Sequence, residues 1–129
     1  MAKGFVLDSS ALLAALFDEP GAAATDAALA EAAMSAVNYS EVIAAQVRKG
    51  EKLEAAMRNV DDLELPLIAW DADLAREAAD LSPLAWTHGL SFGDRACLAT
   101  ARRLRRTVVT AEREWRRLPK LGIDIHIIR

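Results

Sequence analysis

The 129-residue sequence is poor in the residues that form disulfides and bind zinc. It contains one cysteine, Cys97, and two isolated histidines, His88 and His126. A single thiol cannot form an internal disulfide, and without a CxxC or Cys/His pattern the usual signature of a zinc site is missing. We therefore expect Cys97 to be an inert core residue of a protein from a reducing compartment.

Long apolar runs are absent too. No stretch approaches the ~20 apolar residues of a membrane helix, and the N-terminus lacks a charged region followed by a long apolar run. These absences predict a cytoplasmic protein. No repeat or linker divides the chain, and 53% hydrophobic with 27% charged residues fits a single domain over residues 1–129.

Charge is distributed unevenly along the chain. The net charge is −3, but residues 1–94 carry −10 and residues 95–129 carry +7. The basic end could attract a polyanion such as a nucleic acid. A simpler explanation for Arg102, Arg103, Arg105 and Arg106 is that they form the solvated face of a helix.

Strand and helix patterns alternate along the sequence. We predict strands at residues 4–7, 34–37, 65–68, 107–110 and 123–128. We predict helices at 9–17, 22–33, 39–48 with Asn38 as N-cap, 51–60, 71–81 and 91–104, a helical turn at 114–118, and a loop at 83–89. The alternation predicts an α/β fold, a three-layer sandwich with a mainly parallel central sheet flanked by helices.

Four acidic residues are predicted to meet at the carboxyl edge of this sheet, where ligands bind in such folds. Asp8 directly follows the first strand, and Glu112 follows strand 107–110 by two residues. Glu41 and Asp94 are expected in the first turns of helices that begin at the same edge.

Clustered carboxylates repel one another and are stabilised by protons or by cations. Oxygen ligands without histidine or cysteine favour Mg²⁺ or Mn²⁺ over zinc. Two such ions could activate a water and stabilise the leaving oxygen of a phosphodiester. The four acids therefore point to metal-dependent hydrolysis.

Each acid also has a structural explanation. Acids in a first helical turn are favoured by the helix dipole and by capping, which could account for Glu41 and Asp94. Glu112 lies among charged neighbours and could be a solvated surface residue. Asp8 is harder to explain in this way, because an acid between an apolar strand and an apolar helix lies where burial is costly.

Four segments resemble the motifs of PIN domains, and specifically of VapC-type toxins from bacterial toxin–antitoxin systems. They are Val6-Leu7-Asp8-Ser9-Ser10-Ala11-Leu12-Leu13-Ala14, Asn38-Tyr39-Ser40-Glu41-Val42, Leu90-Ser91-Phe92-Gly93-Asp94-Arg95-Ala96-Cys97-Leu98-Ala99 and Val108-Val109-Thr110-Ala111-Glu112-Arg113-Glu114-Trp115. The first alone is weakly specific, but the four occur in the family's order and span nearly the whole chain.

The resemblance implies a metal-dependent endoribonuclease in which Asp8, Glu41 and Asp94 bind Mg²⁺ or Mn²⁺ and Ser10 supports Asp8. It also implies a cognate VapB-like antitoxin that blocks the site, and a homodimer. The family's fourth motif usually carries aspartate where this chain has Glu112, so the longer side chain must retract or bind a second metal through water.

Further roles follow from the resemblance. Thr110 would hydrogen-bond near the site, although a β-branched residue that simply ends a strand explains it equally well. Trp115 could stack on a base, but its spacing with Leu118 indicates a core residue. Candidate contacts to RNA phosphates are the arginines that lie beside Asp94 and Glu112, namely Arg95, Arg113, Arg116 and Arg117.

Two other functions are considered. A PIN-like domain that has lost catalysis would serve only in binding, and Glu112 leaves this open. A receiver-like phosphoacceptor domain predicts adjacent acids after the first strand, whereas Asp8 is followed by Ser9 and Ser10. The sequence does not indicate which RNA is cleaved.

Overall fold

Five short strands form a parallel sheet in the computed structural model, which describes residues 4–129. The strands are β1 (Phe5–Leu7), β2 (Ala32–Ser35), β3 (Leu67–Ile68), β4 (Thr107–Thr110) and β5 (Ile125–Ile127). Their order across the sheet is β3-β2-β1-β4-β5, so the direction of winding reverses between β1 and β4. Ligand sites in open parallel sheets lie at such a reversal, beyond the carboxyl ends of the strands.

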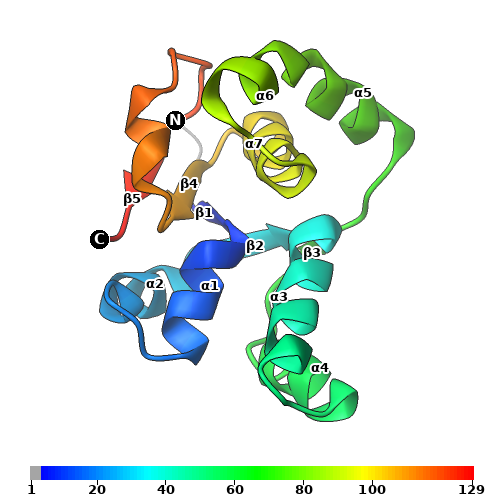
Figure 1. Cartoon of the computed structure of the whole chain (residues 1–129), viewed down its shortest axis with the longest axis vertical. Helices are drawn as coiled ribbons and strands as arrows, with labels where there is room; N and C mark the ends of the chain where they lie inside the picture. The colour runs from blue at the N-terminus through cyan, green and yellow to red at the C-terminus, as the bar shows by residue number, and fades with distance from the viewer. Residues whose placement is uncertain (1–3) are drawn as a thin grey trace.

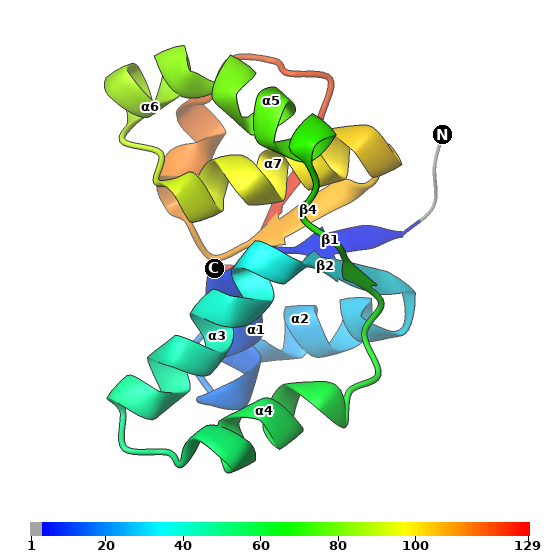
Figure 2. The same cartoon turned by 90° about the vertical axis from the view of Figure 1, so that its right-hand side faces the viewer.

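Helices cover both faces of the sheet, which gives the three predicted layers (Figures 1 and 2). One face is covered by α1 (Ser9–Leu16), α2 (Ala22–Ala28), the 3₁₀ turn η1 (Leu29–Glu31), α3 (Ala36–Arg48) and α4 (Leu53–Asp61). The other is covered by α5 (Ala72–Asp80), α6 (Ser82–His88), α7 (Phe92–Leu104) and the 3₁₀ turn η2 (Arg113–Arg117). Within residues 4–129, no helix is long and apolar enough to cross a membrane.

Two hydrophobic clusters fill the spaces between the layers. Successive strand residues point to opposite faces, so Val6 and Val108 belong to one cluster while Leu7 and Val109 belong to the other. Cys97 is fully buried in the first cluster, as predicted for an inert core residue. Burial raises the pKa of its thiol further above the usual range. Trp115 is also buried there, which agrees with a core role.

The predicted loop at residues 83–89 is wrong, because these residues belong to helix α6. Pro83 stands in the first turn, where proline loses no helical hydrogen bond. Gly89 ends the helix with φ +68°, a conformation that favours glycine. Pro83 and Gly89, which predicted a loop in the sequence, therefore mark the start and the end of the short helix α6.

The predicted boundary between β2 and α3 is also wrong. The helix predicted at 22–33 ends earlier, so β2 begins at Ala32, two residues before the predicted start. The N-cap of α3 is Ser35, whose hydroxyl accepts a hydrogen bond from the Val37 N–H, and not Asn38. Glu41 therefore lies beyond the first turn of α3, and helix capping does not explain its position.

Candidate functional site

Asp8 lies at the carboxyl end of β1 and is almost completely buried, with 2% of its surface exposed. Its Oδ2 accepts hydrogen bonds from the hydroxyls of Ser10 (2.6 Å) and Thr110 (2.9 Å). Its buried Oδ1 has no hydrogen-bond partner within residues 4–129. Burial raises the pKa of Asp8 from 3.8 to about 7; the two hydroxyls lower it, while the charges of Asp94 and Glu112 raise it.

Ser10 and Thr110 also tie the end of β1 to the residues that follow β4. The Ser10 hydroxyl accepts from the Ala111 N–H (3.0 Å), and the Thr110 hydroxyl accepts from the Glu112 N–H (3.0 Å). The hydrogen bond expected from Thr110 is thus present. Each hydroxyl orients Asp8 while it is itself fixed by a backbone N–H.

Glu41 projects from α3 into the same edge of the sheet. Its Oε1 accepts hydrogen bonds from the Ser9 hydroxyl (2.8 Å) and from the side-chain amide of Asn38 (2.9 Å). The same amide nitrogen donates to the Gly93 carbonyl (3.0 Å), which joins α3 to α7. Gly93 itself packs against the Glu41 carboxylate so closely that a Cβ atom would collide with it.

Sequence reasoning missed Ser9, Asn38 and Gly93 as site residues. The sequence offered one signal, since all three lie within one to three residues of a predicted acid. Only the packing of α3 against α7 shows that Asn38 and Gly93 meet at Glu41.

Asp94 lies in the first turn of α7 and forms a capping box with Ser91. Its Oδ2 accepts from the Ser91 N–H (2.8 Å), and its own N–H donates to the Ser91 hydroxyl (3.1 Å). Partial burial raises the pKa of Asp94 and the charge of Glu41 adds to this, whereas the hydrogen bonds from Ser91 lower it. The cap holds the carboxylate in place at the edge of the sheet.

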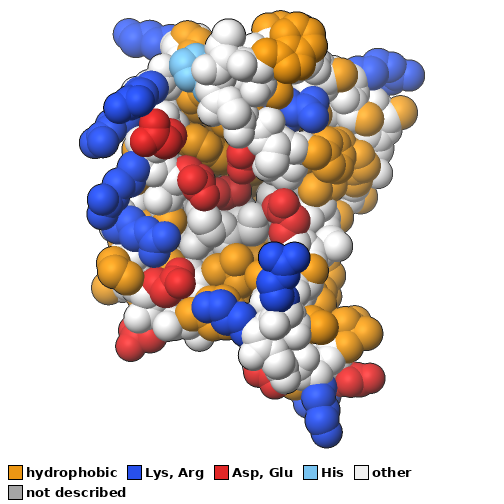
Figure 3. Space-filling view, in the orientation of Figure 1, with side chains coloured by type: hydrophobic (Ala, Val, Ile, Leu, Met, Phe, Trp, Pro, Cys, Tyr) orange, Lys and Arg blue, Asp and Glu red, His pale blue; other side chains and the backbone are white. Residues whose placement is uncertain are grey.

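The four predicted acids therefore share one edge of the sheet. Glu112 is exposed at the end of β4, and its charge acts on Asp8. Figure 3 shows acidic side chains gathered around a hollow near the middle of one face. Among residues 4–129, no three Asp, Glu, His or Cys side chains lie close enough together to hold a metal ion.

The four arginines predicted to contact RNA are held in different ways. Arg95 donates to the Ala78 carbonyl (3.3 Å), and Arg117 pairs with Glu114 (3.2 Å). Arg113 donates to the Arg129 carbonyl (3.2 Å), and Arg116 is exposed on η2. Their role in RNA binding stays a prediction.

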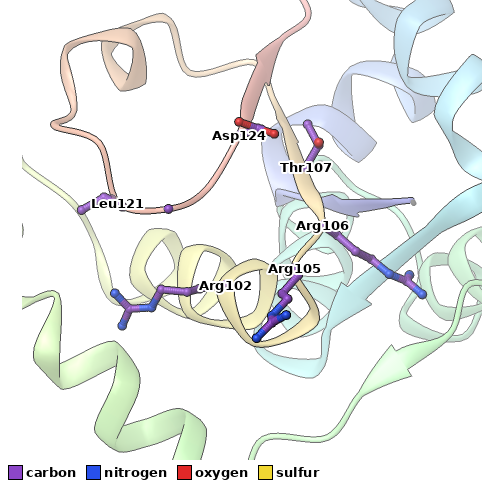
Figure 4. Close-up of a pocket in the computed structure, with 7 residues that line it drawn as sticks. Arg102, Arg105, Arg106, Thr107, Leu121 and Asp124 are labelled. Atoms are coloured by element: carbon purple, nitrogen blue, oxygen red, sulfur yellow. The ribbon is translucent and has the colours of Figure 1, made fainter. Parts of the chain in front are cut away.

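The other basic cluster lies at the opposite edge of the sheet. Arg102, Arg105 and Arg106, at the end of α7, line a pocket of about 660 Å³ together with Thr107 and Asp124. Figure 4 shows the three arginine side chains pointing in different directions. They do not converge on one point. The predicted helix face is only partly correct, because α7 ends at Leu104, Arg105 is its C-cap and Arg106 follows it.

Comparisons with known proteins agree with this fold. The family model described as "PIN domain" matches residues 5–121. No curated protein sequence matches the chain. Similar solved structures include VapBC2 from Rickettsia felis bound to a DNA fragment from its promoter, which is 19% identical with a TM-score of 0.73, the match covering 97% of this chain and 98% of that one.

Two further solved structures resemble the chain over nearly its whole length. FitAcB from Neisseria gonorrhoeae is 20% identical with a TM-score of 0.69, the match covering 94% of this chain and 95% of that chain. VapBC-5 from Mycobacterium tuberculosis, a member of the VapBC family of toxin–antitoxin systems, is 22% identical with a TM-score of 0.61, and the match covers 100% and 99% of the two chains.

Proposed function

The chain belongs to the PIN domain family, and we propose that it is a metal-dependent endoribonuclease that acts as the toxin of a type II toxin–antitoxin pair. The observation that carries the proposal is the gathering of Asp8, Glu41 and Asp94 at one edge of the sheet, with Asp8 almost completely buried. The family match also removes the reason to consider a receiver-like domain.

The donor set fits a hard divalent cation. Asp8 keeps one buried oxygen without a partner, and an unpaired buried carboxylate oxygen is costly unless a cation or a proton joins it. Asp8, Glu41 and Asp94 would hold Mg²⁺ or Mn²⁺, and Glu112 would hold a second ion or act through water. Such a bound ion supplies an activated water and neutralises charge on the phosphodiester.

The protein's own residues hold these acids in position. Ser10 and Thr110 occupy Oδ2 of Asp8 and leave Oδ1 free. Ser9 and Asn38 fix Oε1 of Glu41. Hydrogen bonds of this kind orient ligands and typically change metal affinity or activity by about 10- to 100-fold when removed.

The partner is proposed from the structural neighbours. A toxin–antitoxin complex from Klebsiella pneumoniae and VapBC-5, a member of the VapBC family of toxin–antitoxin systems, share this fold over nearly the whole chain. We infer that a VapB-like antitoxin binds this chain and blocks its acidic edge, that the chain pairs into a homodimer, and that residues 1–129 act in the cytoplasm as one domain.

The test is cleavage of RNA by the purified protein with Mg²⁺, with Mn²⁺ and with EDTA. We expect metal-dependent cleavage that falls at least about 100-fold in Asp8→Asn and in Asp94→Asn, with the fold retained, because each change removes an anionic ligand at constant volume. Asp124→Asn is the matched control, since Asp124 is exposed at the opposite edge of the sheet. Full activity in Asp8→Asn, or activity in EDTA, would overturn the proposal.

A further inference from the structure

An open pocket of about 550 Å³ adjoins the acidic site. Glu41 and Gly93 line it, so the pocket reaches one of the predicted acids and the residue that precedes another, Asp94. Trp70 and Phe92 line it as well, and so do the hydroxyl-bearing residues Ser40 and Ser91. Its volume lies within the about 300–1,000 Å³ range of small-ligand sites.

The pocket contains an aromatic pair in which Phe92 is exposed and Trp70 is partly buried. Trp70 and Phe92 meet edge to face, with ring centroids 5.4 Å apart and planes at 89°. Half of Phe92 is exposed, and the Arg95 guanidinium lies 5.9 Å from its ring. Trp70 packs against the hydrophobic core and, through its contact with Phe92, holds that ring against it. A rigidly supported ring with an exposed surface offers a stacking platform.

A second open pocket, of about 440 Å³, is also lined by Glu41. It is lined by Ala44, Ala45, Arg48 and Lys49, and both cationic residues are exposed. Glu41 therefore lines both an aromatic pocket and a cationic one. A ligand that crosses the acids would meet a ring surface on one side and positive charge on the other.

We propose that the aromatic pocket is a nucleobase subsite for single-stranded RNA. One unpaired base stacks on Phe92 beside Trp70, while the backbone crosses the acids and its phosphates run toward Arg48 and Lys49. The hydroxyls of Ser40 and Ser91 reach the edge of the base. The inference rests on the proposed function, and it names the substrate class: a base in a duplex is already stacked and cannot enter.

The test compares RNA with and without a base in the Asp8→Asn protein, where cleavage is slow. A fluorescent uridine oligonucleotide and its abasic counterpart are titrated by anisotropy. Phe92→Leu is expected to weaken uridine binding by about 5- to 100-fold and to leave abasic binding unchanged, because the aromatic surface is lost while an apolar side chain remains. Phe92→Tyr keeps an aromatic ring and should therefore bind the uridine oligonucleotide as tightly as the Asp8→Asn parent.

A second readout follows the base itself. RNA that carries 2-aminopurine should lose fluorescence on binding, and Phe92→Leu should abolish this quenching. Trp86→Leu is the control, since Trp86 is 82% exposed on α6 and does not line the pocket. It should change neither signal.

The outcomes separate this inference from the proposed function. If the protein cleaves RNA and Phe92→Leu binds uridine RNA as tightly as its parent, the nucleobase subsite is wrong and the nuclease stands. Equal losses for uridine and abasic RNA would also overturn the subsite, because Phe92 would then act through the fold alone. If the protein neither binds nor cleaves RNA, both ideas fail.

Discussion

At the residue scale, the buried carboxylate of Asp8 provides a binding site but lowers the folding stability of the protein when it is ionised. Its carboxylate is buried, and its pKa of about 7 lies above the value of 3.8 that applies to an exposed aspartate. Without a cation the folded state favours the protonated acid, whereas the unfolded chain loses this proton near pH 4. The contribution of Asp8 to stability is therefore greatest below about pH 4 and is lost as the pH rises toward 7.

We expect Asp8→Asn to be more stable than the wild type at pH 8 in EDTA, by roughly 1–4 kcal/mol, because the neutral amide removes a buried charge. Urea denaturation at pH 4 and pH 8 measures the difference, which should nearly vanish at pH 4. Mg²⁺ should raise the stability of the wild type and leave the variant unchanged. A wild type that is the more stable protein at pH 8 without metal would contradict this account.

Gly93 is a second residue at which a single added atom, the Cβ of alanine, is expected to disturb the site. Alanine favours a helix over glycine by about 0.5–1 kcal/mol, so Gly93→Ala should not weaken α7. Its Cβ would collide with the Glu41 carboxylate and displace it. We expect RNA cleavage to fall about tenfold or more while the melting temperature holds, as measured by cleavage assays and thermal unfolding.

The Gly93 prediction has a built-in control. If Gly93→Ala acts only by displacing Glu41, it should add no further loss in a Glu41→Ala background, where the carboxylate is already gone. Additive losses would show that Gly93 acts elsewhere.

At the scale of elements, helix α7 begins with a capping box whose acid, Asp94, is also one of the predicted site residues. Asp94 caps α7 with Ser91 and also lies at the acidic edge, so the structural explanation is confirmed and is compatible with the proposed role as a metal ligand. The start of the helix is what fixes the carboxylate.

Ser91→Ala separates these two roles. Loss of the N-cap hydroxyl should cost about 0.5–2 kcal/mol of stability. It should also reduce cleavage several-fold, because Asp94 keeps its charge but its helix start is less well held. Denaturation and cleavage assays on the same preparation measure both effects, and a variant that loses stability without losing activity would show that the cap does not position Asp94.

The errors made from the sequence also occur at this scale. The alternation of strands and helices could be predicted, because hydrophobic periodicity and residue propensity are local properties of the sequence. The first residue of α3 could not be predicted, because Ser35 and Asn38 are both good N-cap residues. The pairing of β2 with β1 and β3 determines that Ser35 is the N-cap. Helix α6 was missed because Pro83 and Gly89 were read as breakers, although proline at a start and glycine at an end delimit a helix.

At the scale of the whole molecule, the basic residues that looked continuous in sequence lie at two opposite edges. The arginines that end α7 lie far from the acids, at the edge where β4 begins. The arginines of η2 follow β4 and lie beyond its carboxyl end, on the side of the acids. Only the second group is placed to contact a substrate of the acidic edge.

This division predicts different responses to salt. Arg116→Gln should weaken RNA binding. It should also reduce the slope of the logarithm of the binding constant against the logarithm of the salt concentration by about one, as expected for the loss of one phosphate contact. Arg105→Gln, the matched change at the opposite edge, should leave the slope unaltered. Titrations between low and moderate salt decide this, and equal effects of the two variants would mean that RNA does not distinguish the two edges.

The sequence by itself determined the fold class and the edge at which the acids meet. Alternating strands and helices force parallel crossovers, and in a parallel sheet every carboxyl end of a strand falls on the same edge. Within residues 4–129, tertiary structure alone decided which oxygen of Asp8 has no hydrogen-bond partner, which side chains hold Glu41 and which arginines follow β4 at its carboxyl end. These depend on contacts between residues distant in the chain, such as Asn38 with Gly93, which no local pattern records.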